Sequence, residues 1–311
     1  MNQPGMVVGV AVMTLLAATA GFAQSEAHQG QGVAVVTVLP KQESALPPQI
    51  TMQKLSVKVN GKPVAVTDWK PLQNSLEVVL LIDGSARNSL GNQFDTMEKF
   101  LRALPPNSKA AVAYMAYGRA VIVGKLSTDH ELAVHGLHLP GGLPGSNASP
   151  YFCLSDLAKN WPSADRSARR EVVMVTDGVD NYERQFNPDD PYVEAAISDS
   201  VRAGVVVDSI YWLSTVVADS SLYQSNAGQS NLGEVSDATG GKSFWQGTGN
   251  PVSLQPYFDE LNRRLQHQYE LTFTSPLKGK PEIVNLKLKL SLPGAEVRSP
   301  QQVLVSPAAQ M

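Results

Sequence analysis

Two aspartates occupy positions in the sequence at which their carboxylates could form a binding or reactive site. The apolar runs at 77–83 and 171–177 end abruptly in Asp83 and Asp177, and a glycine follows each. Runs of this kind predict buried parallel strands that deliver a carboxylate to their carboxyl ends. If the two strands are neighbours, both carboxylates lie on one rim of a sheet, where open α/β sheets bind ligands. The alternative is that each aspartate only stabilises the turn after its strand.

The elements that must position these aspartates alternate between strand and helix from Leu76 onward. Strands are predicted at 110–115, 120–123, 205–212 and 242–245, and helices at 92–104, 129–137, 151–159, 189–203, 231–239 and 256–268. This order predicts an α/β fold, a doubly wound and mostly parallel sheet flanked by helices. Ser149 or Asn147 could cap the helix at 151–159.

The two ends of the chain have β character instead. Before Leu76, strands are predicted at 33–38, 55–59 and 62–67, with Asn60-Gly61 as a hairpin turn. After 268, strands are predicted at 269–273, 284–290 and 302–305. We expect these strands to pair with each other in a small β appendage that brings the chain ends together.

The resulting division of the chain has four parts. Residues 1–23 are predicted to be a signal peptide, 24–74 a leader and β segment, 75–268 the α/β domain, and 269–311 a C-terminal β segment. Residues 24–32 are polar and glycine-rich, which predicts a flexible leader.

The motifs resemble those of the von Willebrand factor A fold, and more closely the VWFA-related proteins of acidobacteria. The resemblance lies in Asp83-Gly-Ser85, in 176–181 and in the later 240–245 and 268–273. It implies a divalent metal site at the rim, with Asp83, Ser85, Ser149 and Asp177 as ligands and Ser146 as the alternative to Ser149. Oxygen-only ligands of this kind suit Mg²⁺ or Mn²⁺.

Arg87 departs from the pattern that the resemblance implies, because the third position of the first loop should be a small neutral ligand. A guanidinium turned inward would pair with the two aspartates and take over the charge role of the metal. An Arg87 that points to solvent would leave room for the ion. The sequence therefore leaves a conventional metal site and a degenerate, metal-free site both open.

Other candidate groups have simpler interpretations. Asp180 and Asn181 could support the third loop or only form a turn. Three histidines, His130, His135 and His138, do not share one helical face, so a solvated role is favoured over metal binding.

Two further groups attract attention because of their type. Arg166, Arg169 and Arg170 predict an exposed basic stretch before a strand. Cys153 is the only cysteine, so no internal disulfide can form, and its apolar context favours a buried thiol.

The composition and the first residues limit the partners and the location. A net charge of −3 and a pI near 6.0 argue against nucleic acid as a partner. An uncharged apolar stretch at 6–20, followed by Gly21-Phe22-Ala23, predicts a signal peptide and an exported protein, periplasmic or secreted. An uncleaved anchor is the competing interpretation, and no stable membrane span is expected after cleavage.

Three functions compete at this point. The first is a non-enzymatic, adhesion-type module that binds a protein ligand at the rim, through an acidic side chain of that ligand if a metal is held there. The second is a Mg²⁺-dependent phosphohydrolase with Asp83 as nucleophile, although such enzymes need a second aspartate where this chain has Ser85. The third is a structural envelope domain that makes its contacts through the β appendage.

Overall fold

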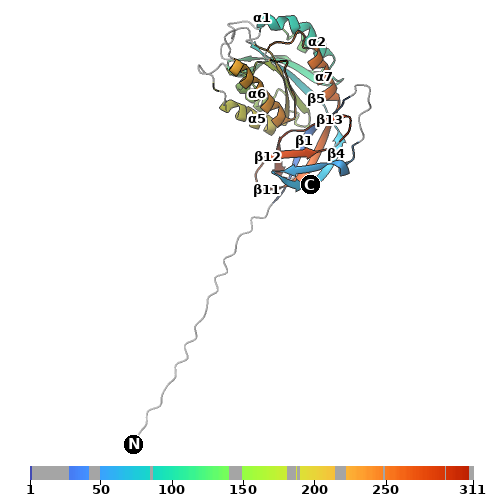
Figure 1. The fold of residues 1–311 in the computed structure, drawn as a ribbon, viewed down its shortest axis with the longest axis vertical. Coiled ribbons are helices and arrows are strands. Elements are labelled where there is room, and N and C mark those ends of the chain that lie inside the picture. Colours follow the sequence, from blue (N-terminus) through green and yellow to red (C-terminus); the bar gives the residue numbers. More distant parts are fainter. Residues whose placement is uncertain are drawn as a thin grey trace.

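The computed structural model describes most of the chain outside its two ends. The described residues are 28–41, 50–84, 87–139, 149–180, 190–213, 222–247, 249–290 and 292–307, together with positions 1 and 187. Two sheets make up this part, an upper one wrapped by helices and a lower one built from both ends of the chain (Figure 1).

The upper sheet has six strands in the order β10-β9-β8-β5-β6-β7. Their bounds are β5 (Leu76–Asp83), β6 (Lys109–Ala116), β7 (Arg119–Ser127), β8 (Arg169–Thr176), β9 (Val205–Tyr211) and β10 (Ser243–Phe244). The first five in this spatial order pair in parallel, whereas β7 is antiparallel to β6. The sheet is therefore mixed. β5 and β8 are neighbours, which meets the condition under which both aspartates lie on one rim.

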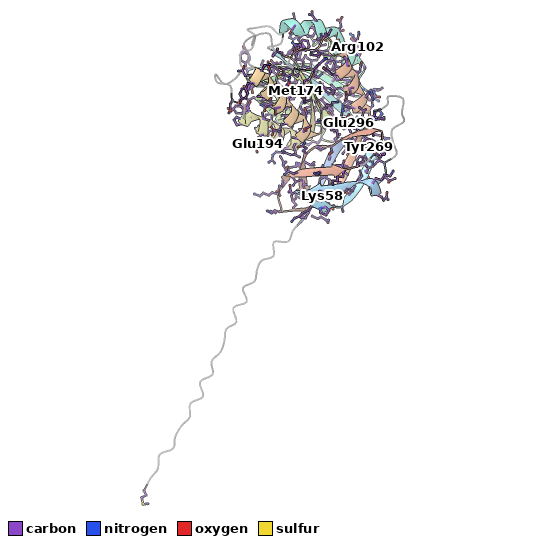
Figure 2. All side chains as sticks on the ribbon, in the orientation of Figure 1. Lys58, Arg102, Met174, Glu194, Tyr269 and Glu296 are labelled. Carbon is purple, nitrogen blue, oxygen red and sulfur yellow. The ribbon has the colours of Figure 1, made fainter. Side chains whose placement is uncertain are left out.

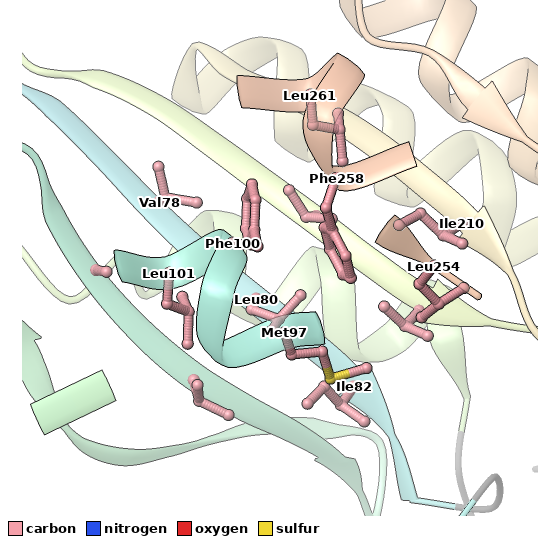
Figure 3. Packing of buried hydrophobic residues seen from close by; sticks show 14 of the residues in the cluster. Val78, Leu80, Ile82, Met97, Phe100, Leu101, Ile210, Leu254, Phe258 and Leu261 are labelled. Carbon is pink, nitrogen blue, oxygen red and sulfur yellow. The ribbon is translucent and has the colours of Figure 1, made fainter. Parts of the chain in front are cut away.

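Helices cover both faces of this sheet, because alternate residues of its central strand β5 are apolar in both directions. One face packs on α2 (Phe94–Arg102), α3 (His130–Val134) and α7 (Gln255–Gln266), and the other on α4 (Pro150–Lys159), α5 (Pro191–Ala203) and α6 (Leu222–Thr239). Phe100 and Phe258 stack with ring centroids 4.6 Å apart and join α2 to α7 over Val78 and Leu80 (Figure 3). Two short elements, α1 (Arg87–Leu90) and a 3-10 turn η3 (Gly91–Gln93), precede α2.

The lower sheet is entirely antiparallel and has eight strands in the described part of the chain. They are β1 (His28–Pro40), β2 (Ser56–Val59), β3 (Lys62–Val64), β4 (Val66–Pro71), β11 (Gln268–Leu277), β12 (Glu282–Lys289), β13 (Ala295–Arg298) and β14 (Gln302–Pro307), and a 3-10 turn η1 (Met52–Lys54) precedes β2. The strands from the two ends of the chain interleave, since β1 lies between β11 on one side and β13 and β14 on the other.

This sheet corrects two expectations. It is not a small appendage, because it has more described strands than the helix-wrapped sheet. Residues 28–32, which were expected to belong to a flexible leader, are the first part of β1 and pair with β11 and β14. The molecule is thus an α/β fold with one mixed and one antiparallel sheet, rather than a single doubly wound sheet with a minor attachment.

The glycines of β1 explain why a polar, glycine-rich segment forms a central strand. A Cβ atom on Gly32 would come within 2.4 Å of Cζ of Phe273, and one on Gly30 within 2.6 Å of Cγ1 of Val305. The inward side chains of β1 increase in size along the strand, from the glycines at its start to Val36 and Val38, which are fully buried. Close packing of the neighbouring large side chains therefore selects glycine here in spite of its low strand propensity.

An ionic cluster joins the two sheets. Arg264 of α7 is 4% exposed and pairs with Glu260 at 2.8 Å and with Glu296 of β13 at 2.7 Å. Arg298 of β13 also pairs with Asp237 of α6. Glu296 lies where the helical part meets the antiparallel sheet (Figure 2). Because a buried arginine is costly to leave unpaired, these contacts fix how the two sheets meet.

Candidate functional site

The carboxyl ends of β5 and β8 carry the two aspartates that the sequence singled out. Asp83 is 1% exposed and Asp177 is 2% exposed. The hydroxyl of Thr176, the last residue of β8, donates a 2.7 Å hydrogen bond to Oδ2 of Asp83. The two central strands are therefore tied together at the rim by a buried, charge-assisted hydrogen bond.

Asp177 shapes the loop that follows β8. Its Oδ1 accepts a 3.0 Å hydrogen bond from the backbone N–H of Val179, and the N–H of Gly178 donates to Oγ1 of Thr176 at 3.2 Å. Gly178 has a φ of +70°, which favours glycine. Asp177 thus stabilises the turn after its strand, as the alternative interpretation of the sequence proposed. It does so while it also lies on the rim.

Ser149 links the second loop to the third. It is the N-cap of α4, where its hydroxyl accepts from the N–H of Phe152 at 3.3 Å. The same hydroxyl donates to Oδ2 of Asp180 at 2.5 Å. This hydrogen bond connects Ser149 to the third loop at the rim. Asp180 therefore supports that loop, which is one of the two roles that the sequence allowed for it.

Several predicted site groups lie outside the described residues. These are Ser85, Ser146 and Asn181, together with the side chain of Arg87, of which only the backbone in α1 is described. The choice between Ser146 and Ser149, and the direction of Arg87, therefore stay predictions.

Two residues that sequence reasoning missed complete the described rim. The hydroxyl of Tyr151 on α4 donates to the carbonyl oxygen of Gly178 at 2.7 Å. On α6, Gly228 packs so closely that a Cβ atom there would lie 2.2 Å from the carbonyl oxygen of Asp177. The signal in the sequence was weak, because a tyrosine and a glycine within helices have many other roles. Thr176 had a clearer signal, as it directly precedes Asp177.

Burial controls the proton state of the groups behind the rim. Desolvation, and then the field of Asp190, holds the pKa of Tyr151 well above its usual value, so its hydroxyl stays a donor. Burial also raises the pKa of the Cys153 thiol, with Asp83 as the next cause. Cys153 is 0% exposed, so the predicted buried thiol is confirmed.

The carboxylate and hydroxyl oxygens at the rim are ligands that suit a hard cation such as Mg²⁺. They already take part in hydrogen bonds, which a bound ion would have to displace. Asp83 accepts from Thr176, Asp177 from Val179, and Ser149 donates to Asp180. Among the residues that the structure describes, no group of three or more His, Cys, Asp or Glu side chains could hold a metal ion. A metal at Asp83, Asp177 and Ser149 would compete with these hydrogen bonds.

The histidines and the basic stretch do not form one cluster. His130 and Arg170 lie at the end of the sheet opposite to the rim, whereas His138 contacts Tyr114, which pairs with Ile82 next to Asp83. His130 contacts the hydroxyl and the carbonyl oxygen of Ser108, and His138 stacks on Tyr114 with ring centroids 4.7 Å apart. Arg170 corrects the expectation of an exposed stretch, since it is 6% exposed and its guanidinium donates to the carbonyl oxygen of Asp165 at 3.0 Å.

No helix in the described part of the chain combines the length and the apolar character that crossing a bilayer requires. Residues 2–23 of the segment predicted to be a signal peptide lie outside the described residues.

Comparison with known proteins gives structural neighbours only, since neither a protein-family model nor a curated protein matches the chain. A von Willebrand factor type A protein from Catenulispora acidiphila has a TM-score of 0.44 and 14% identity, covering 89% of this chain and 74% of its own. The vWF domain of the pilus tip protein Mfa5 from Porphyromonas gingivalis has a TM-score of 0.40 and 10% identity, covering 62% and 95%. BatB from Bacteroides thetaiotaomicron has a TM-score of 0.44 and 11% identity, covering 61% and 97%.

The first two of these neighbours are named as von Willebrand factor proteins, the family that the sequence motifs resemble. At such identities the likeness concerns the fold and gives no roles to individual residues.

Proposed function

We propose that the chain is an exported, non-enzymatic protein-binding module that presents the carboxyl rim of its mixed sheet to a protein ligand. The observation that carries this proposal is the linked rim, in which Thr176 joins Asp83 to β8 and Ser149 joins α4 to Asp180. Hydrogen bonds across three loops hold these groups in fixed positions before any partner arrives, which lowers the entropy cost of binding.

Catalysis is the weaker alternative for this rim. The residue two positions after Asp83 is Ser85 rather than the second aspartate that phosphohydrolases of this kind need. Hydrolysis of p-nitrophenyl phosphate in the presence of Mg²⁺ tests this alternative. Activity of the wild type that is lost in the Asp83→Asn variant would favour an enzyme over a binding module.

The rim can work in a metal-dependent or a metal-free form. In the first form Asp83, Ser85, Ser149 and Asp177 would hold Mg²⁺ or Mn²⁺, and a carboxylate of the ligand would complete the coordination. In the second form Arg87 supplies the positive charge. The two forms differ in what a metal titration does to the purified protein.

Thermal unfolding of the wild type and of Asp177→Ala, with increasing Mg²⁺ or Mn²⁺, separates the two forms. A metal-binding rim raises the Tm of the wild type and leaves that of the variant unchanged, because only the folded wild type binds the ion. Equal responses of the two proteins would eliminate the metal-dependent form and leave the metal-free one.

Affinity capture from a native cell envelope tests the proposal itself. We expect the wild type to retain a protein that Asp83→Ala loses, whereas Glu282→Ala, an exposed carboxylate on β12 of the other sheet, retains it. Circular dichroism must show that Asp83→Ala is folded. Capture that survives Asp83→Ala but fails in Glu282→Ala would assign binding to the antiparallel sheet instead.

A further inference from the structure

A cleft of about 490 Å³ lies between the two sheets, at the end of the helix-wrapped sheet opposite to the rim. One wall is formed by the outer faces of β1 and β14, and the other by the C-terminal end of α5 and the first residues of β9. Pockets of about 300–1,000 Å³ at domain boundaries are typical sites for small ligands.

Much of the wall surface is apolar. The apolar lining includes Val33, Val35, Val201, Val205, Val206 and Leu304, together with Pro300 and Pro307. Val33 of β1 is 50% exposed, and Val35 and Leu304 beside it are half-buried. The open apolar surface of the cleft is therefore the wall formed by Val33, Val35 and Leu304, whereas Val201, Val205 and Val206 are buried behind the opposite wall.

Three arginines line the same cleft, and no acidic side chain of the described residues does. They are Arg166, Arg170 and Arg202. Arg166 and Arg202 are exposed, whereas Arg170 is 6% exposed. None of the three forms an ion pair with any residue that the structure describes, and Nε of Arg170 has no hydrogen-bond partner there. The guanidinium of Arg170 donates to backbone carbonyl oxygens of Ser163, Asp165 and Ala203 instead. In a chain of net charge −3, the cleft is thus a local concentration of positive charge.

The carboxylates nearest to Arg170 are already engaged. Glu77 and Asp165 are the acidic groups whose field reaches Arg170. Glu77 accepts from Lys109 at 2.9 Å and from the indole of Trp161 at 2.7 Å. Asp165 accepts from the N–H and the hydroxyl of Ser167. Neither is among the residues that line the cleft, so an anion in the cleft would meet the arginines without a competing acidic side chain.

We propose that this cleft binds a small anionic amphiphile, a molecule with a carboxylate or phosphate head and an apolar body. The head would pair with Arg166 and Arg202 at the mouth, over the fixed charge of Arg170, because guanidinium groups bind such oxyanions by paired hydrogen bonds. The body would cover Val33 and its apolar neighbours, and the volume fits a ligand rather than a folded protein. The site is independent of the rim.

Calorimetric titration of the full chain with octyl phosphate, below its micelle concentration, tests the site. Octanamide and octylammonium serve as the neutral and the cationic analogues. We expect octyl phosphate to bind, octanamide to bind more weakly and octylammonium not to bind. Equal binding of the phosphate and the ammonium compound would overturn the proposal, since it would show that charge has no part in recognition.

Two pairs of variants locate the binding. The double variant Arg166→Gln/Arg202→Gln should lose roughly tenfold in affinity for octyl phosphate, as expected for two partly exposed ion pairs. The matched control Arg119→Gln/Lys125→Gln removes two exposed charges from β7 and should bind as the wild type does. Equal losses in both double variants would assign the effect to net charge and overturn the site.

Val33→Asp provides a second test, since it places a carboxylate on the wall that faces the arginines. It should abolish binding of octyl phosphate, whereas Val121→Asp, at a valine 49% exposed on β7, should not.

An experiment with lipid vesicles distinguishes a free small ligand from the headgroups of a membrane. Phosphatidylglycerol vesicles that retain the protein, with no binding of free octyl phosphate, would assign the arginines to a membrane surface and contradict the proposal.

Discussion

Thr176 and Asp83 join the two central strands of the helix-wrapped sheet, through a 2.7 Å hydrogen bond from the threonine hydroxyl to a carboxylate that is 1% exposed. The bond crosses between residues 93 positions apart in the chain. Removal of a hydrogen-bond donor leaves part of the desolvation cost of a buried carboxylate uncompensated, so this pair should matter for folding as well as for the rim.

Thr176→Val keeps the shape of the side chain and removes the donor. We expect the free energy of unfolding to fall by about 1–3 kcal/mol, because Asp83 loses a buried partner. Thr176→Ser retains the hydroxyl and should lose less. Urea denaturation of the three proteins measures the effect, and a valine variant as stable as the serine variant would contradict it.

Gly228→Ala tests the contact between α6 and the third loop. The new Cβ would lie 2.2 Å from the carbonyl oxygen of Asp177, so helix and loop must separate at a cost of about 1–3 kcal/mol. Gly233→Ala in the same helix meets nothing within 4 Å and should stabilise by about 0.5–1 kcal/mol. Opposite signs of the two changes in urea midpoint are the expected result, and two increases would contradict the close contact.

Gly32→Ala tests the packing of β1 on β11. Phe273 is fully buried, so it cannot easily move away from a Cβ atom that would approach its Cζ to 2.4 Å. We expect a loss of about 1–3 kcal/mol. Phe273→Leu in the same chain should relieve part of it, so a double-mutant cycle should show favourable coupling. If the changes in the free energy of unfolding are strictly additive, the side chains at positions 32 and 273 are not in contact.

The buried pair Glu171 and Asp208 should make stability depend on pH. Both carboxyl groups lie on neighbouring strands, and burial is the main cause that raises their pKa values, to about 8 for Glu171 from its ordinary 4.5. The folded protein therefore binds more protons than the unfolded chain between these two values. It follows that stability falls as pH rises through this window, with a slope on the order of 1 kcal/mol per pH unit.

Glu171→Gln should flatten this decline, because the amide does not ionise while it can still accept a hydrogen bond from Gln268. Urea denaturation between about pH 5 and 8 measures the slope. Glu282→Gln, an exposed carboxylate on β12, is the control and should keep the slope of the wild type. Parallel profiles for wild type and Glu171→Gln would show that another group causes the pH dependence.

Local patterns in the sequence determined the elements that they encode directly. The valine-rich runs before Asp83 and Asp177 are β5 and β8, and Ser149 is the N-cap of α4. Asn60 and Gly61 form the turn between β2 and β3 with φ values of 48° and 80°. In each case the residues that decide the conformation are adjacent in the chain, so propensity and turn chemistry suffice.

Tertiary structure alone decided the rest. Residues 28–32 have no strand pattern, and they become a central strand only because β11 and β14, encoded more than 200 residues later, supply hydrogen-bond partners and large side chains. Arg170 is buried because residues 163–165 and the end of α5 surround it. Likewise, sequence placed Asp83 and Asp177 on one rim, but the bond from Thr176 depends on strand register, which a single chain segment does not specify.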